Sequence, residues 1–116
     1  MTNKYEPKQK ALHVTGRPMI LQGTFAGLNR VDYGENKSEE MYFLLLEDCS
    51  GLPKDNAGRS QVTIHSEVCR FVDENFVAGD ALQLPITVSA RIDKNNRAAL
   101  SVNHVKTIAM PQKLNK

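Results

Sequence analysis

The clearest hydrophobic pattern in the sequence lies between Gly79 and Ile108. Apolar residues there stand at every second position: Leu84, Ile86, Val88, Ala90 and Ile92. This period of two is typical of a β-strand that is buried on one face. A polar turn follows with Asn95 and Asn96, which tolerate positive φ, and the alternation resumes at Ala98. The stretch therefore predicts a β-hairpin.

The first half of the chain contains two more strand-like segments. Residues 19–28 read as a strand in which Gly23 and Gly27 mark a bulge, a sharp bend or a close backbone approach. Residues 29–40 are polar and predict a long loop. Residues 41–48 are apolar on both faces, which is typical of a strand that is covered on each side or of one with an exposed aromatic residue.

A second loop, a strand and a helix follow before the hairpin. Residues 49–60 are rich in Gly, Pro, Asn and Asp and predict a loop. Residues 61–65 alternate again. Residues 66–76 have apolar positions at helical spacing and predict one short helix, with Ser66 as its N-cap. The predicted order is three strands, a helix and two strands, so the expected fold class is all-β with one short helix.

The 116 residues fit one domain, which we expect over residues 19–108. Residues 1–18 are polar and basic and predict a flexible arm, in which residues 12–14 could form a short extended piece. Residues 109–116 predict a short basic tail. No apolar run approaches the roughly 20 residues that span a bilayer. The N-terminus also lacks the apolar core of a signal peptide, so we expect a cytoplasmic protein without membrane contacts.

The net charge of +2 hides an uneven distribution. Residues 1–18 carry four basic residues and one acidic residue, a net charge of +3. Residues 19–80 carry five basic and eleven acidic residues, a net charge of −6, and residues 81–116 carry six basic residues and one acidic residue, a net charge of +5. The positive charge at the ends and on the hairpin is compatible with an anionic partner or with association between copies.

The residues that usually carry catalysis or bind metals form no recognisable pattern. Cys49 and Cys69 have no CxxC or His-Cys spacing, and the three histidines are far apart. The sequence has no Gly-rich phosphate loop, nucleophile elbow or Ser-His-Asp signature. We therefore expect no enzyme activity, no metal site and no cofactor.

Two stretches resemble a known family. Residues 20–28, ILQGTFAGL, are similar to the opening strand of bacterial, phage and plasmid single-stranded DNA-binding proteins and of primosomal replication protein N. Residues 79–102, GDALQLPITVSARIDKNNRAALSV, are similar to their helix exit and last hairpin. The resemblance implies a five-stranded OB-fold Greek-key barrel, which binds oligonucleotides on its second and third strands and the adjoining loops.

The resemblance also implies a function in DNA replication, recombination or conjugative transfer, with single-stranded DNA as the partner. Binding would be largely independent of the DNA sequence, and the binding form would be a homodimer or a higher homo-oligomer. Replication or recombination proteins would be further partners. The chain lacks Trp and ends in a basic tail rather than an acidic tip, so the partner-recruiting role of that tip is not expected here. A phage- or plasmid-type protein, or one similar to primosomal replication protein N, fits better than the main cellular version.

Binding single strands requires cations along the phosphates and aromatic faces against the bases. Tyr33 lies in the first predicted loop beside Arg30 and Lys37, with several carboxylates that would repel phosphate. Tyr42 is predicted to stack from the barrel face, which makes its neighbour Phe43 a core residue; the reverse assignment stays open. The remaining candidate cations lie in the second loop and on the last hairpin: Lys54, Arg59, Arg91, Lys94 and Arg97.

Two other functions remain open. The net charge of −6 over residues 19–80 is unusual for a DNA-binding surface and favours an OB-fold module that binds another protein. OB-folds also bind RNA, so an RNA-binding domain is the third possibility.

Overall fold

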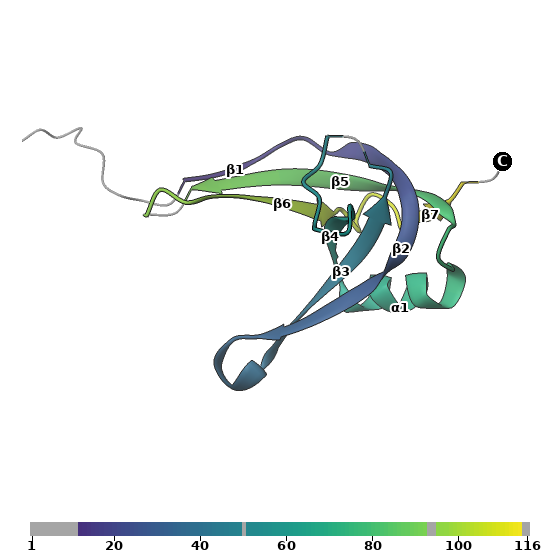
Figure 1. The fold of residues 1–116 in the computed structure, drawn as a ribbon, viewed down its shortest axis with the longest axis horizontal. Coiled ribbons are helices and arrows are strands. Elements are labelled where there is room, and N and C mark those ends of the chain that lie inside the picture. The colour runs from purple at the N-terminus through teal and green to yellow at the C-terminus, as the bar shows by residue number, and fades with distance from the viewer. Residues whose placement is uncertain (1–11, 50, 93–94, 115–116) are drawn as a thin grey trace, which may run out of the picture.

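The computed structural model describes residues 12–49, 51–92 and 95–114. The elements in this part of the chain are β1 Leu12–Thr15, β2 Met19–Tyr33, the 3-10 turn η1 Glu35–Lys37, β3 Glu39–Glu47, β4 Ser60–Ile64, α1 Ser66–Asn75, β5 Ala81–Ile92, β6 Ala98–His104 and β7 Gln112–Lys113 (Figure 1). The prediction of a mainly β protein with one short α-helix is confirmed.

The strand pairings form a closed ring. β2 pairs with β3, β3 with β4, β4 with β6 and β6 with β5, and β5 pairs again with β2. All of these pairs are antiparallel except β4 with β6, which run parallel. Among the described residues, β4 and β6 are joined by a single register pair, Thr63 with Asn103. The ring therefore has one short parallel seam between long antiparallel pairs.

The bend of β2 is what allows this strand to take part in two pairings. Residues up to Thr24 pair with β5, and residues from Thr24 onward pair with β3. Gly23 lies where the partners change, and a Cβ atom on it would stand 2.7 Å from Cys49 Sγ. A bulge follows between Phe25 and Gly27, where Gly27 has a φ of 151°. Both glycines predicted to mark a bend or a close approach do so.

The core lies inside the ring and continues to α1. Phe25 is buried, and its ring contacts Phe76 edge to face at 6.2 Å between centroids. Val68 and Val72 of α1 are fully buried against the same cluster. The helix covers the range expected, but its N-cap is His65 rather than Ser66, and no side chain caps it. The N-cap prediction was wrong because the extended backbone ends at His65, one residue earlier than the alternation indicated, so Ser66 already belongs to the helix.

Two long hairpins, β2–β3 and β5–β6, extend from the ring in Figure 1. Most of the loop predicted over residues 29–40 is therefore strand, since β2 runs to Tyr33 and β3 begins at Glu39. This part of the hairpin exposes its side chains, so its ladder forms without the apolar alternation that marks a buried strand. At the tip, Asn36 and Lys37 both have positive φ, as a type I′ turn requires.

Both ends of the described chain add strands to β5. Residues 12–15 of the predicted basic arm form β1, which pairs with Ser89–Ile92, and residues 112–113 of the predicted tail form β7. Residues 1–11 of the arm and residues 115–116 of the tail lie outside the described residues. No helix in the described part of the chain is long and apolar enough to cross a membrane.

Candidate functional site

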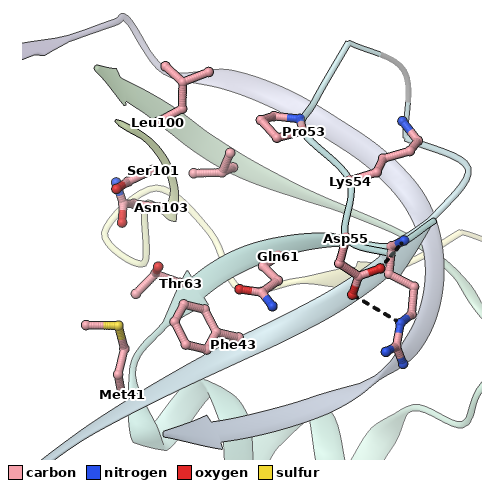
Figure 2. A pocket seen from close by; sticks show the side chains of 12 residues that line it. Met41, Phe43, Pro53, Lys54, Asp55, Gln61, Thr63, Leu100, Ser101 and Asn103 are labelled. Carbon is pink, nitrogen blue, oxygen red and sulfur yellow. Dashed lines mark hydrogen bonds and ion pairs between the residues drawn. The ribbon is translucent and has the colours of Figure 1, made fainter. Parts of the chain in front are cut away.

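A groove of about 510 Å³ lies between β3 and β4 on one side and β6 on the other (Figure 2). We call it the β3–β6 groove. Phe43 and Thr63 are register partners on β3 and β4, so their side chains share a face. Leu100 and Asn103 of β6 line the opposite side, and the loop over residues 53–59 supplies the rim. The groove therefore combines an aromatic ring, an aliphatic side chain and several neutral polar groups.

Phe43, rather than Tyr42, is the aromatic residue of this groove. Phe43 is half-buried and lines the groove, whereas Tyr42 packs against the core cluster on the other face of β3. The sequence prediction placed Tyr42 on the outer face and Phe43 in the core, and the structure has the reverse orientation. Both faces of β3 are apolar, because one covers the core and the other lines the groove, so periodicity did not distinguish them.

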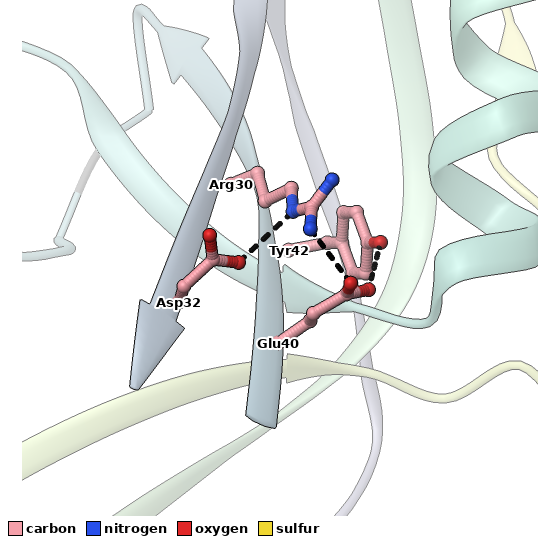
Figure 3. Close-up of polar contacts among 4 residues, drawn as sticks. All are labelled: Arg30, Asp32, Glu40 and Tyr42. Atoms are coloured by element: carbon pink, nitrogen blue, oxygen red, sulfur yellow. Dashed lines mark hydrogen bonds and ion pairs between the residues drawn. The ribbon is translucent and has the colours of Figure 1, made fainter. Parts of the chain in front are cut away.

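The polar end of Tyr42 belongs to a network on the β2–β3 hairpin (Figure 3). Arg30 Nε donates to Asp32 Oδ1 at 3.0 Å and Arg30 Nη2 donates to Glu40 Oε1 at 2.7 Å. The Tyr42 hydroxyl donates to Glu40 Oε2 at 2.5 Å, and this bond raises the pKa of Tyr42 above its usual range. Arg30, predicted to contact phosphate, is thus held by two carboxylates.

Tyr33 continues the groove-side face of the same hairpin. Val31 is the register partner of Met41, and Tyr33 is the partner of Glu39, so by strand alternation these side chains share the face of Phe43. Tyr33 is 43% exposed, and Val31 is 40% exposed. An apolar row therefore leads from the groove toward the hairpin tip, where Lys37 is exposed.

The loop beside the groove brings two of the predicted cations to its lining. Lys54 Nζ donates to the carbonyl oxygen of Cys49 at 2.5 Å. Arg59 Nε lies 3.5 Å from Asp55 Oδ2. Asp55 also lines the groove, and hydrogen bonds from the backbone N–H groups of Arg59 and Ala57 hold its pKa below the usual range.

The cations of the β5–β6 hairpin stand apart from the groove lining. Arg91 is exposed on β5, where its register partners are Ala99 of β6 and a β1 residue. Arg97 is exposed in the turn directly before β6, and Lys94 lies outside the described residues. Of the nine predicted binding residues, only Lys54 and Arg59 line the β3–β6 groove among the residues that the structure describes.

Several groove residues were not predicted from the sequence. Gln61 and Thr63 occupy the outward positions of the alternating strand β4, so the period-two pattern did carry a signal for them. Ser101 and Asn103 occupy the corresponding positions of β6. Neutral hydroxyl and amide groups of this kind donate to and accept from the edges of bases. Their place in one groove becomes apparent only when the ring places β4 beside β6.

Other reactive side chains lie away from the groove lining. His104 is 7% exposed, its Nε2 donates to the carbonyl oxygen of Ala109 at 2.6 Å, and burial lowers its pKa. Cys49 is buried, and burial raises the pKa of its thiol. Within the described ranges, no three His, Cys, Asp or Glu side chains gather in a way that would hold a metal ion.

No protein-family model matches the chain, and neither a curated protein nor a solved structure matches it.

Proposed function

We propose that the protein is an OB-fold protein that binds single-stranded DNA in the β3–β6 groove. The strand order supports the fold assignment. Counting β2 as the first strand of the ring, the fourth strand β5 lies between the first and the fifth, and the helix joins the third strand to the fourth. This arrangement is the one expected for a five-stranded Greek-key OB-fold. β1 and β7 are additions at its edge.

The observation that carries the functional proposal is the position of Phe43. It lies on the second strand of the proposed OB-fold, within a groove that the third strand and the last hairpin also line. OB-folds bind oligonucleotides on their second and third strands and the loops beside them. A half-buried ring flanked by the Thr63 and Asn103 side chains suits a base that stacks on one face and forms hydrogen bonds at its edge.

The size of the site favours several copies working together. One stacked base contributes about 1–3 kcal/mol, and Phe43 and Tyr33 offer two stacking positions per chain. A homodimer or higher homo-oligomer would place further grooves along one strand and raise the overall affinity through effective concentration. Replication, recombination and conjugative transfer are the processes that supply such single strands.

Fluorescence anisotropy with a labelled oligo-dT tests the proposal. Phe43→Leu keeps an apolar side chain but removes the aromatic face, so we expect about 5- to 150-fold weaker binding. Phe71→Leu is the matched control, since Phe71 lies on α1 and outside the groove lining, and its affinity should equal that of the wild type. A wild-type protein that fails to bind oligo-dT at low salt, or a Phe43→Leu variant that binds normally, would contradict the proposal.

Two alternatives have specific outcomes in the same assays. The pairing of Arg30 with Asp32 and Glu40 keeps the β2–β3 hairpin acidic, which favours an OB-fold module that binds a protein. That function predicts nuclease-insensitive capture of one protein partner and no oligonucleotide binding. An RNA-binding domain predicts that an RNA oligomer outcompetes DNA of equal length.

A further inference from the structure

The loop over residues 53–59 is built around the carboxylate of Asp55. Asp55 Oδ1 accepts hydrogen bonds from the backbone N–H groups of Ala57 and Arg59, both at 2.9 Å. The backbone closes the same turn, since Asp55 N donates to Arg59 O at 2.8 Å and Gly58 N donates to Asp55 O at 3.0 Å. Two N–H groups and an adjacent guanidinium are the groups that recognise an anion, and here the chain supplies that anion itself.

The contact between Asp55 and the Arg59 side chain is close but incomplete. Arg59 Nε stands 3.5 Å from Asp55 Oδ2, which is an ion pair rather than a well-formed hydrogen bond (one of the two dashed lines at Asp55 in Figure 2). The same Nε atom is buried and has no hydrogen-bond partner among the described residues. The Arg59 side chain is 36% exposed, so the guanidinium can leave Asp55 at a small cost and remain in contact with solvent.

The other cation of this rim is also held within the protein. Lys54 Nζ donates to the Cys49 carbonyl oxygen at 2.5 Å. A phosphate group that approaches the rim of the groove therefore meets one carboxylate and two cations that already have partners. The carboxylate repels the phosphate and competes with it for the charge of Arg59.

We propose that Asp55 attenuates nucleic-acid binding in the β3–β6 groove, by occupying the position beside Arg59 that a phosphate of the bound strand would otherwise take. This inference rests on the proposed function. It makes Asp55 a specificity-determining residue: the wild-type groove favours contacts to bases over contacts to phosphates. A strand is then held through stacking and can be released readily, which suits a protein that covers single strands temporarily.

Asp55→Asn tests the inference because its amide oxygen can still accept the two backbone hydrogen bonds while its charge is lost. Arg59 is then available for one more phosphate. We expect about two- to five-fold tighter binding of oligo-dT at low salt. The slope of log K against log salt concentration should become more negative by about 0.7, the value for one phosphate contact on a single strand. Asp73→Asn on α1 makes the same charge change outside the groove lining and should leave the slope unchanged.

Two variants of Arg59 assign the gain to this side chain. In the wild-type background, Arg59→Gln should leave the salt slope unchanged, because Arg59 contacts Asp55 rather than a phosphate. In the Asp55→Asn background, the same substitution should return the slope to the wild-type value. The first of these measurements needs no change at Asp55, so it tests the inference even if Asp55→Asn disturbs the loop. Thermal unfolding of each variant reports such a disturbance.

The outcomes distinguish a failure of this inference from a failure of the proposed single-stranded DNA binding. If the wild type binds and Asp55→Asn has the same affinity and slope, the inference is wrong and the proposed function stands. A slope that falls when Arg59→Gln is made in the wild type also overturns the inference. If only Asp55→Asn binds, the proposed function of the wild type is wrong, and the inference, which describes weakened rather than abolished binding, is wrong with it. If neither protein binds at low salt, both the function and the inference fail.

Discussion

The substitution Gly23→Ala probes the bend that lets β2 close the ring. A Cβ atom at this position would stand 2.7 Å from Cys49 Sγ, 3.1 Å from Glu47 O and 3.3 Å from Leu46 Cβ. Cys49 is 2% exposed, so its side chain is enclosed by other atoms and cannot swing out into solvent. Overpacking of this kind costs typically about 1–3 kcal/mol, and we expect Gly23→Ala to destabilise the protein by that amount.

A double-mutant cycle with Cys49→Ala shows whether the sulfur is the source of this cost. Cys49→Ala alone removes a buried atom similar in size to a methylene, at a cost of about 1 kcal/mol. The double variant should be more stable than the sum of the two single changes predicts, by about 1 kcal/mol or more. Rescue should be partial, because the contact with Glu47 O involves backbone and remains.

Urea denaturation followed by circular dichroism measures these differences. With a slope of about 1–3 kcal/mol/M, the expected loss moves the midpoint of Gly23→Ala by about 0.5–2 M. Gly16→Ala is the matched control, since its new Cβ would meet only Val88 O, at 3.4 Å. An unchanged midpoint for Gly23→Ala, or strict additivity with Cys49→Ala, would refute the packing argument.

Two further predictions concern the hairpin tip and a buried histidine. Lys37 has a φ of 56°, a left-handed conformation that glycine adopts freely and a β-branched residue does not. Lys37→Gly should therefore raise the unfolding free energy by about 0.5–1 kcal/mol, and Lys37→Val should lower it. Thermal denaturation of both variants tests this. Burial lowers the pKa of His104 in the folded state, so below about pH 6.5 the unfolded chain takes up a proton that the folded protein does not. Stability should therefore fall as the pH drops from about 6.5 through the lowered pKa of His104. The variant His104→Gln can still donate to the Ala109 carbonyl oxygen, and its urea midpoint should fall less between about pH 7 and 5. Equal pH profiles of the two proteins would contradict the assignment to His104.

The elements with one buried face could be predicted from the sequence. The hairpin of β5 and β6 follows its apolar alternation, which is buried at Leu84, Ile86 and Val102 and exposed toward the tip of the hairpin. The helix α1 follows the helical spacing of its buried valines. Phe25 lies on the strand predicted over residues 19–28 and is buried in the core. These predictions succeeded because burial on one side leaves a period in the sequence that matches the geometry of the element.

The parts that failed are those where burial does not set the pattern. The outer half of the β2–β3 hairpin, beyond residue 28, is exposed and carries polar residues, so it resembled a loop although its backbone is paired. The orientation of Phe43 depends on which face of β3 meets the groove, and both faces are apolar. The pairing of Arg59 with Asp55 depends on a tight turn whose hydrogen bonds have no periodic signature.

The pairing of β4 with β6 has the fewest register pairs in the described part of the ring, namely Thr63 with Asn103, and both residues also line the β3–β6 groove. Local opening of a protein starts where few backbone hydrogen bonds must break, so β4 and β6 separate more easily than the long antiparallel pairs. A molecule bound across the groove would contact β4 and β6 at once, and it would therefore stabilise their pairing against local opening. Slower amide exchange along β4 and β6 would then report occupancy of the groove, at a place where no tryptophan is present to signal it.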